Sequence, residues 1–286
     1  MVTPGVVEPA APQPLPGPVV DNHTHLDHVR RGDVPLTLDD AIAAAEAVNV
    51  TRLVQIGCDL DSARWSVDVA ARRPQVLAGV SLHPTQASKI VADQGESALR
   101  EAFAEIESLA ANPRVRVIGE TGLDHYWVPA DDVRGRAAQE DSFRFHIDLA
   151  KRTGKVLQIH DRDAHDDVLR VLAEEGAPEH TVFHCFSGSV EMARACAEAG
   201  WYLSFAGPLT FANAEPLRAA LRAVSPERVL VETDAPYLTP HPHRGKRNAS
   251  YLMPWTVRRM AAEWQLDETA MCARLNATCE ALYGPW

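Results

Sequence analysis

Residues 19–27 read VVDNHTHLD, two valines followed by a cluster of polar side chains. The valines predict a buried strand over Val19–Asp21, and His23 and His25 lie just beyond it. Side chains two positions apart in an extended segment point the same way, so these two imidazoles can bind one metal ion. A histidine pair of this kind also occurs by chance on protein surfaces, so the other strands have to decide between the two interpretations.

Seven further β-branched segments follow and alternate with amphipathic stretches whose apolar residues recur every three or four positions. The predicted strands after Val19–Asp21 are Arg52–Ile56, Gln75–Val80, Val115–Gly119, Val156–Ile159, Thr181–Phe183, Trp201–Phe205 and Arg228–Val231. The predicted helices are Leu38–Val48, Ser62–Arg72, Glu96–Ala111, Arg136–Arg152, Ala164–Glu175, Val190–Ala199, Ala214–Val224, Tyr251–Trp264 and Asp267–Tyr283. This alternation predicts an α/β fold, and a (β/α)8 TIM-type barrel of one domain over residues 19–286 has the matching number of strands. An open doubly wound sheet alternates in the same way, so the placement of the polar residues has to decide.

Metal-binding residue types recur at the ends of four later predicted strands. Glu120, His160 and His184 each directly follow a predicted strand, and Asp234 follows the last one closely. A barrel gathers its functional groups at this end of its strands. Any one of these residues could cap a helix or lie in the core, but the recurrence favours a barrel with a metal centre.

A carboxylate can bridge two cations with its two oxygens, and Glu120 is the natural candidate for that place. We expect His23, His25 and Asp234 to bind one ion. His160 and His184 would then bind the other. Two divalent ions, Mg, Zn or Mn, would activate water for hydrolysis of an ester, phosphodiester or amide, with Glu120 and Asp234 as the catalytic carboxylates. Asp234 could also take a proton from the attacking water.

Composition bounds the remaining possibilities. The net charge of −11 argues against non-specific coating of nucleic acid but not against a nucleic-acid substrate held locally. Five cysteines without a C-x-x-C pair predict free thiols. Neither a signal peptide nor a long apolar run is evident, so we expect no membrane association and a cytoplasmic location; the oligomeric state stays open. Residues 1–18 contain six prolines and predict a disordered tail.

Seven ordered segments resemble the TatD family of metal-dependent deoxyribonucleases, within the amidohydrolase-like barrels. They are DNHTHLD at 21–27, LHP at 82–84, GETGLD at 119–124, IHDRDAHDD at 159–167, HCFSG at 184–188, ETDAPYL at 232–238 and HRGKRN at 243–248. The resemblance implies an eight-stranded barrel and the same six metal ligands. It also implies a deoxyribonuclease, most simply an exonuclease, or alternatively a deacylase of D-aminoacyl-tRNA or another ester or amide hydrolase. The chain departs from the family pattern at Ser81, His125, Ala249 and Ser250, none of them a proposed ligand.

Cationic and aromatic residues near the strand ends are candidates for binding the substrate, DNA or possibly tRNA. Arg162 lies two positions after His160, and a basic loop contains Arg244, Lys246 and Arg247. Guanidinium groups bind phosphate oxygens in pairs, although such a loop can also be a solvated turn. His83 could contact the substrate or a nearby carboxylate. Tyr126 and Trp127 could stack on a base or pack at the rim. Asp21 and Asp27 are expected to orient His23 and His25.

Overall fold

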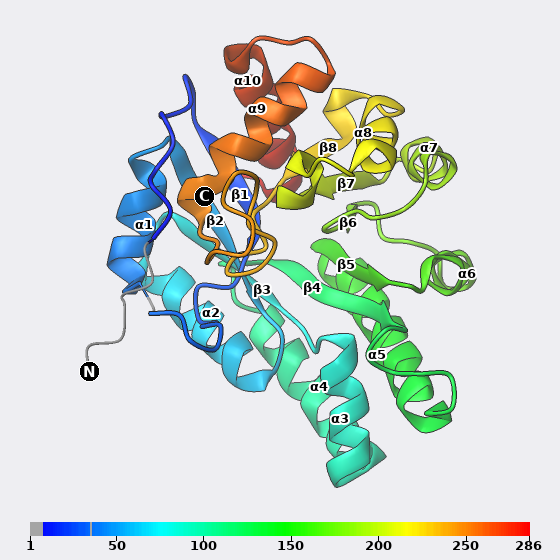
Figure 1. Cartoon of the computed structure of the whole chain (residues 1–286). Coiled ribbons are helices and arrows are strands. Elements are labelled where there is room, and N and C mark those ends of the chain that lie inside the picture. The colour runs from blue at the N-terminus through cyan, green and yellow to red at the C-terminus, as the bar shows by residue number, and fades with distance from the viewer. Residues whose placement is uncertain (1–7, 35) are drawn as a thin grey trace.

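The computed structural model describes residues 8–34 and 36–286, and its eight parallel strands form a barrel surrounded by helices (Figure 1). The strands are β1 (Val19–Thr24), β2 (Val50–Gly57), β3 (Val76–Val80), β4 (Val115–Asp124), β5 (Val156–Arg162), β6 (Thr181–Phe183), β7 (Tyr202–Phe205) and β8 (Val229–Val231). They pair in sequence order from β1 to β8, as right-handed β-α-β connections require. The predicted (β/α)8 barrel is therefore confirmed.

The helices follow the predicted pattern with one addition. They are α1 (Leu38–Glu46), α2 (Leu60–Arg72), α3 (Pro84–Gln94), α4 (Glu96–Ala110), α5 (Val133–Thr153), α6 (His165–Glu175), α7 (Val190–Glu198), α8 (Glu215–Arg222), α9 (Met253–Glu263) and α10 (Glu268–Tyr283). Helix α3 was not predicted because its buried face contains Pro84, Ala87, Ser88 and Val91, which form too small an apolar stripe. Pro84 at the first turn was the available signal. None of the helices in the described residues is long and apolar enough to cross a membrane.

A buried side chain and a backbone hydrogen bond join β1 to the residues that follow β8. Asp21 accepts hydrogen bonds from the backbone N–H and the hydroxyl of Thr233, at 2.9 and 2.5 Å, and from the hydroxyl of Ser250 at 2.7 Å. The backbone N–H of Asp234 donates to the carbonyl of His23 at 2.9 Å across the same seam. Burial raises the pKa of Asp21 to about 7, despite these hydrogen bonds. Asp21 thus joins the first strand to the segment that follows the last one.

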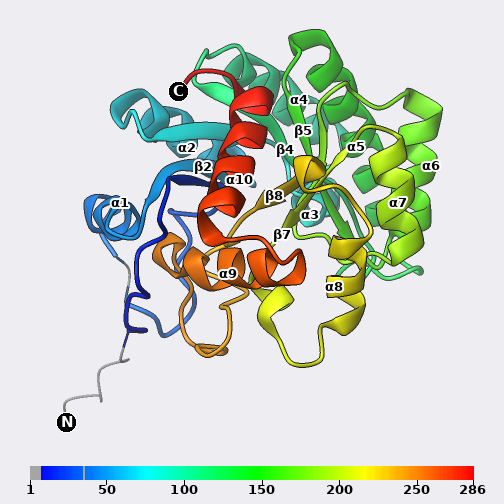
Figure 2. The same ribbon diagram turned by 90° about the horizontal axis from the view of Figure 1, so that it is seen from above.

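Inward-facing residues change in character along the strands. Near the amino ends they are apolar, as at Val20, Val156 and Val182, and they pack with Leu282 and Tyr283 of α10. Figure 2 looks down onto α10, which contacts β1 and β8. Further along the strands the interior becomes polar. Helix α10 therefore covers the apolar end of the barrel and leaves the polar end open.

The amino-terminal segment was expected to be a disordered tail over residues 1–18. Residues 1–7 lie outside the described part, and residues 8–18 form an extended segment that contacts the rest of the chain. Leu15 is only 1% exposed, its N–H donates to the carbonyl of Val48 at 3.2 Å, and its carbonyl accepts from Asn49 at 2.6 Å. Proline-rich composition predicts an extended backbone, which is what the segment adopts, but it does not show whether a single leucine finds a pocket.

Candidate metal centre

The six side chains expected to bind metal meet at the carboxyl end of the barrel, around Glu120. Its Oε2 lies 2.8 Å from Nε2 of His184 and 3.0 Å from Nδ1 of His160. Its Oε1 lies 3.4 Å from Nε2 of His25 and 3.7 Å from Nε2 of His23. Each carboxylate oxygen thus faces its own pair of imidazoles.

Asp234 completes the side of the cluster formed by the first strand. Its Oδ1 lies 3.3 Å from Nε2 of His25 and 3.7 Å from Nε2 of His23, and those two nitrogens are 3.3 Å apart. Ligand atoms of His23, His25 and Glu120 all lie within 4.8 Å of one another, and so do those of Glu120, His160 and His184. Imidazole and carboxylate groups at this spacing fit divalent cations such as Zn²⁺ or Mn²⁺.

Two glycines allow β4 to present Glu120 to the centre. A Cβ at Gly119 would lie 2.6 Å from the carbonyl oxygen of Gln158, and one at Gly122, where φ is +136°, would lie 2.1 Å from the carbonyl oxygen of His160. The β4–β5 register shifts between Ile118 and Thr121, so Glu120 lies at an irregularity inside the strand. The sequence analysis had placed Glu120 just after the end of this strand. Strand β5 likewise continues past His160 to Arg162.

Groups that were not predicted orient the imidazoles from behind. Nδ1 of His23 contacts Oε1 of Gln158 at 2.8 Å, and Nδ1 of His25 contacts the carbonyl of Ile56 at 3.0 Å. Because an acceptor at Nδ1 fixes the proton there, Nε2 of each ring is left free to bind a metal ion. Asp21 and Asp27 do not perform this role: Asp27 accepts from the amide of Gln55 at 2.7 Å instead. The expectation for these two aspartates was therefore wrong, since neighbours in sequence point to different surroundings.

Glu232 orients His184 in the same way. It is fully buried, and its Oε1 lies 3.3 Å from Nδ1 of His184 and accepts from the backbone N–H of Cys185 at 2.7 Å. Its Oε2 accepts from the hydroxyl of Ser204 at 2.5 Å. Asn22 links this carboxylate to Gln158, and the Tyr283 hydroxyl of α10 donates to Asn22. A continuous polar network therefore connects the covered end of the barrel to the imidazoles.

The charge balance of the cluster favours a cation. Burial alone would lower the pKa of His25, but the hydrogen bond to Asp234 and the charge of Glu120 raise it to about 10. Burial would raise the pKa of Glu120, yet His184 and His160 hold it well below its usual range. Burial would likewise raise the pKa of Asp234, but the hydrogen bond and charge of His25 lower it. The carboxylates are therefore anionic at neutral pH, and the field that attracts protons to the imidazoles also attracts metal ions.

Sequence comparison identifies the family. The family described as TatD related DNase matches residues 20–284. The chain belongs to this family. It is 45% identical to a metal-dependent hydrolase, TatD, of Mycobacterium tuberculosis, over 91% of this chain and 96% of the relative, and 35% identical to the metal-dependent hydrolase YabD of Bacillus subtilis, over 90% and 96%. The crystal structure of YjjV, a TatD homologue of Escherichia coli, superposes with a TM-score of 0.81 at 20% identity, covering 93% of this chain and 97% of that one. The protein is thus a metal-dependent hydrolase of the TatD family.

In this TatD-family chain, His83 caps a helix next to the centre. Its Nδ1 accepts the backbone N–H of Thr85 at 3.2 Å at the start of α3, and its ring lies 4.4 Å from that of His160, nearly perpendicular to it. Burial, followed by the charge of His160, lowers the pKa of His83 to about 3. His83 is therefore neutral. It lies beside His160, and its contact with a substrate remains a proposal.

Asp124 contacts a candidate metal ligand and was not singled out in the sequence analysis. Its Oδ2 lies 3.1 Å from Nε2 of His160, and its Oδ1 accepts the backbone N–H of Trp127 at 2.8 Å. The sequence places it four residues after Glu120, at the end of the same strand, which was the available signal. Asp124 thus connects a candidate metal ligand to the turn that follows β4.

The four predicted basic residues divide into accessible and buried groups. Arg162 is exposed, and its guanidinium group lies 4.0 Å from the ring centre of Tyr126; Arg244 lies 4.4 Å over the ring of Phe211. Lys246 is exposed as well. Arg247 is only 6% exposed and donates to the carbonyl of Val34 and to Glu8. It fastens the amino-terminal segment, so the structure does not support its predicted contact with phosphate.

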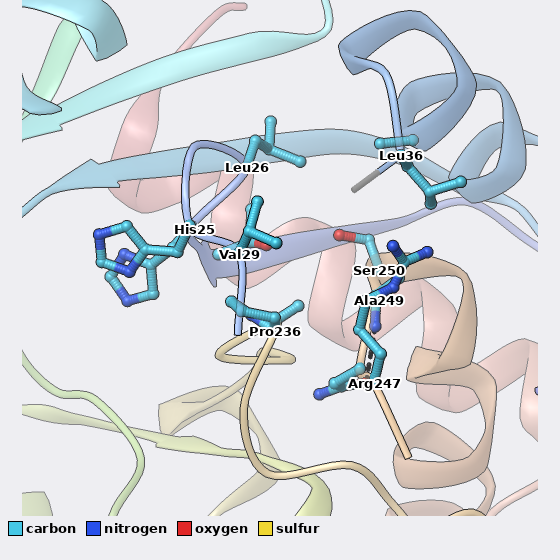
Figure 3. A pocket seen from close by; sticks show the side chains of 13 residues that line it. His25, Leu26, Val29, Leu36, Pro236, Arg247, Ala249 and Ser250 are labelled. Carbon is cyan, nitrogen blue, oxygen red and sulfur yellow. Dashed lines mark hydrogen bonds between the residues drawn. The ribbon is translucent and has the colours of Figure 1, made fainter. Parts of the chain in front are cut away.

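A small cavity lies beside the centre, between the residues after β1 and those after β8 (Figure 3). It has a volume of about 60 Å³ and is lined by His25, Val29, Pro236 and Ser250 among others. That volume holds a few water molecules and no nucleotide. The large substrate of a nuclease would therefore have to approach through the open mouth of the barrel.

Proposed function

We propose that this chain is a deoxyribonuclease, an exonuclease that hydrolyses DNA phosphodiester bonds at the mouth of the barrel with two divalent metal ions. The observation that carries the proposal is the position of Glu120, whose two oxygens each face a separate set of imidazoles. The family description and the accessible cations Arg162 and Arg244 favour a nucleic-acid substrate over a small neutral ester.

In this proposal His23, His25 and Asp234 would hold one ion, His160 and His184 would hold the other, and Glu120 would be a ligand common to the two sets. When bound, divalent ions acidify water and stabilise the charge that develops on a phosphoryl group.

The chain's own residues would then complete the reaction. Asp234 is the proton acceptor that we propose for the attacking water, since it is anionic and its side chain is 14% exposed, more than that of Glu120 at 6%. Gln158 and Glu232 hold the imidazoles in position. Arg162 and Arg244 would bind phosphate oxygens of the DNA chain.

The test compares the wild type with Glu120→Gln, which keeps the side-chain volume but removes the charge. We expect loss of bound metal and of DNA cleavage, with an unchanged circular dichroism spectrum. Glu107→Gln is the matched control, because Glu107 is exposed and pairs with Arg152 on the surface. Labelled single-stranded DNA and D-aminoacyl-tRNA are each incubated with Mg²⁺, Mn²⁺ or Zn²⁺.

Cleavage of DNA by the wild type and by Glu107→Gln, but not by Glu120→Gln, supports the proposal. Release of a D-amino acid without DNA cleavage would favour the deacylase alternative. Metal-loaded wild type that cuts neither substrate rules out both, and cleavage by a metal-free Glu120→Gln variant rules out the proposed centre.

A further inference from the structure

The turn after β4 presents two large aromatic side chains to solvent beside the metal centre. Tyr126 is 55% exposed and Trp127 is 64% exposed, although such side chains normally contribute to a core. Their rings are nearly perpendicular, with centres 5.0 Å apart. Two exposed aromatic rings of this size do not gain the stabilisation that burial in a core would give them. Their exposure therefore indicates a role in binding.

The position of this turn is fixed relative to the candidate metal ligands. The Trp127 N–H donates to Asp124, whose other oxygen contacts His160. Two hydrogen bonds therefore connect the backbone of Trp127 to an imidazole of the centre. The N–H of His125 also donates to the carbonyl of Arg162 at 2.9 Å, which holds the turn against the end of β5.

Arg162 adds a cation to the aromatic pair. Its guanidinium carbon lies 4.0 Å from the ring centre of Tyr126 and 5.7 Å from that of Trp127. Among the described residues no carboxylate forms an ion pair with it, whereas arginines such as Arg144 and Arg170 are surrounded by glutamates. A stacked guanidinium group without a carboxylate partner is free to bind phosphate.

A hollow continues outward from Trp127. It is a widely open hollow of about 460 Å³ between α3 and the residues before α5, bordered by Thr85, Ser88, Lys89 and Val128 among others. Asp132 also borders it, but its carboxylate caps α5 by accepting from Gly135 at 2.8 Å. A space of this size beside an indole ring is within the range of small-molecule binding sites.

We propose that Tyr126, Trp127 and Arg162 form a platform that stacks an unpaired base of single-stranded DNA next to the metal centre, with the adjoining phosphate on Arg162. This inference rests on the proposed function and specifies its substrate as a single-stranded end. Flat aromatic faces stack on any base, and a guanidinium group beside them binds the backbone. Bases inside a duplex have both faces covered by neighbours, so an internal base pair cannot use the platform.

Binding is measured by fluorescence anisotropy with a labelled single strand whose terminal phosphorothioate linkages resist cleavage, in the presence of Mn²⁺. We expect Trp127→Ala to bind between about fivefold and about 100-fold more weakly than the wild type, from the usual contribution of one stacked base. The matched control is Trp286→Ala, since Trp286 is also a tryptophan with an arginine, Arg52, over its ring, but it packs beside Tyr283 of α10 at the covered end of the barrel. That variant should bind like the wild type.

A second strand with an abasic residue at each of its three terminal positions tests the contact itself. The wild type should bind the abasic strand more weakly than the intact strand. Trp127→Ala, which lacks the stacking ring, should bind the two strands with similar affinity. The platform would be overturned if the abasic positions weakened binding equally in the wild type and in Trp127→Ala. It would also be overturned if Trp127→Ala bound the intact strand with wild-type affinity. If the wild type binds DNA as expected but never cuts it with any metal, the proposed function fails and the platform stands. If the wild type cuts DNA but neither Trp127→Ala nor the abasic strand changes binding, the platform fails and the proposed function stands.

Discussion

The role of Glu232 gives the sharpest test of how the barrel interior supports the metal centre. In Glu232→Gln, the amide oxygen can keep both contacts of Oε1, with the N–H of Cys185 and with Nδ1 of His184. The new NH₂ group then faces two donors. The hydroxyl of Ser204 can rotate to accept from it, but its own proton then loses its present acceptor, and the amide nitrogen of Asn22 at 3.5 Å cannot accept at all. The long hydrogen bond from Asn22 is lost and the buried Ser204 hydroxyl loses its acceptor, so the free energy of unfolding should fall by about 1–3 kcal/mol.

The same substitution should also weaken metal binding. The substitution removes the buried negative charge behind His184 and so makes its Nε2 a poorer ligand. Loss of such an orienting carboxylate typically weakens metal binding by about 10- to 100-fold, which corresponds to about 1.4–2.7 kcal/mol. Of the two proposed ions, the one held by His184 should be affected more.

Metal affinity is measured by competition with a chromogenic chelator for Zn²⁺, and stability by denaturation of the same samples. Ser204→Ala is the control, because it removes a hydrogen bond to the carboxylate and leaves the charge in place; it should weaken metal binding much less. A folded Glu232→Gln protein with wild-type affinity at both sites would refute the role given to Glu232.

Three further predictions concern stability. Tyr283→Phe removes the hydroxyl shared by Asn22 and Gln158 and should lower the free energy of unfolding by about 1–3 kcal/mol in urea denaturation, since both amides are buried; no loss would mean that the network does not form. His146 is buried and its pKa is lowered to about 4, so its contribution to stability is present above about pH 6.5 and is lost as the pH falls toward 4. Over that range, the difference in the free energy of unfolding between wild type and His146→Gln should shrink by at most about 3 kcal/mol. A difference that does not depend on pH would contradict this. Leu15→Ala should lower the free energy of unfolding by about 2–4 kcal/mol if the amino-terminal segment is docked in solution, whereas a disordered segment would give no change.

The sequence by itself determined the barrel and the residues of its mouth. Strand and helix periods are local, so all eight strand starts were predicted within two residues and Thr181–Phe183 was predicted with both ends correct. The ligand candidates were found because a parallel barrel places the residues that follow its strands at one end. That rule needs no knowledge of individual contacts.

Only the tertiary structure decided which groups stand behind those residues. Gln158 meets His23 across 135 positions of sequence, and Glu232 meets His184 across 48. Such pairs depend on strand register and on bulges, which the residue pattern does not specify. The same holds for Arg247, which looked like a phosphate ligand in its basic loop but is buried against the amino-terminal segment. Local composition sets what a side chain can do, and the packing of distant segments sets which partner it has.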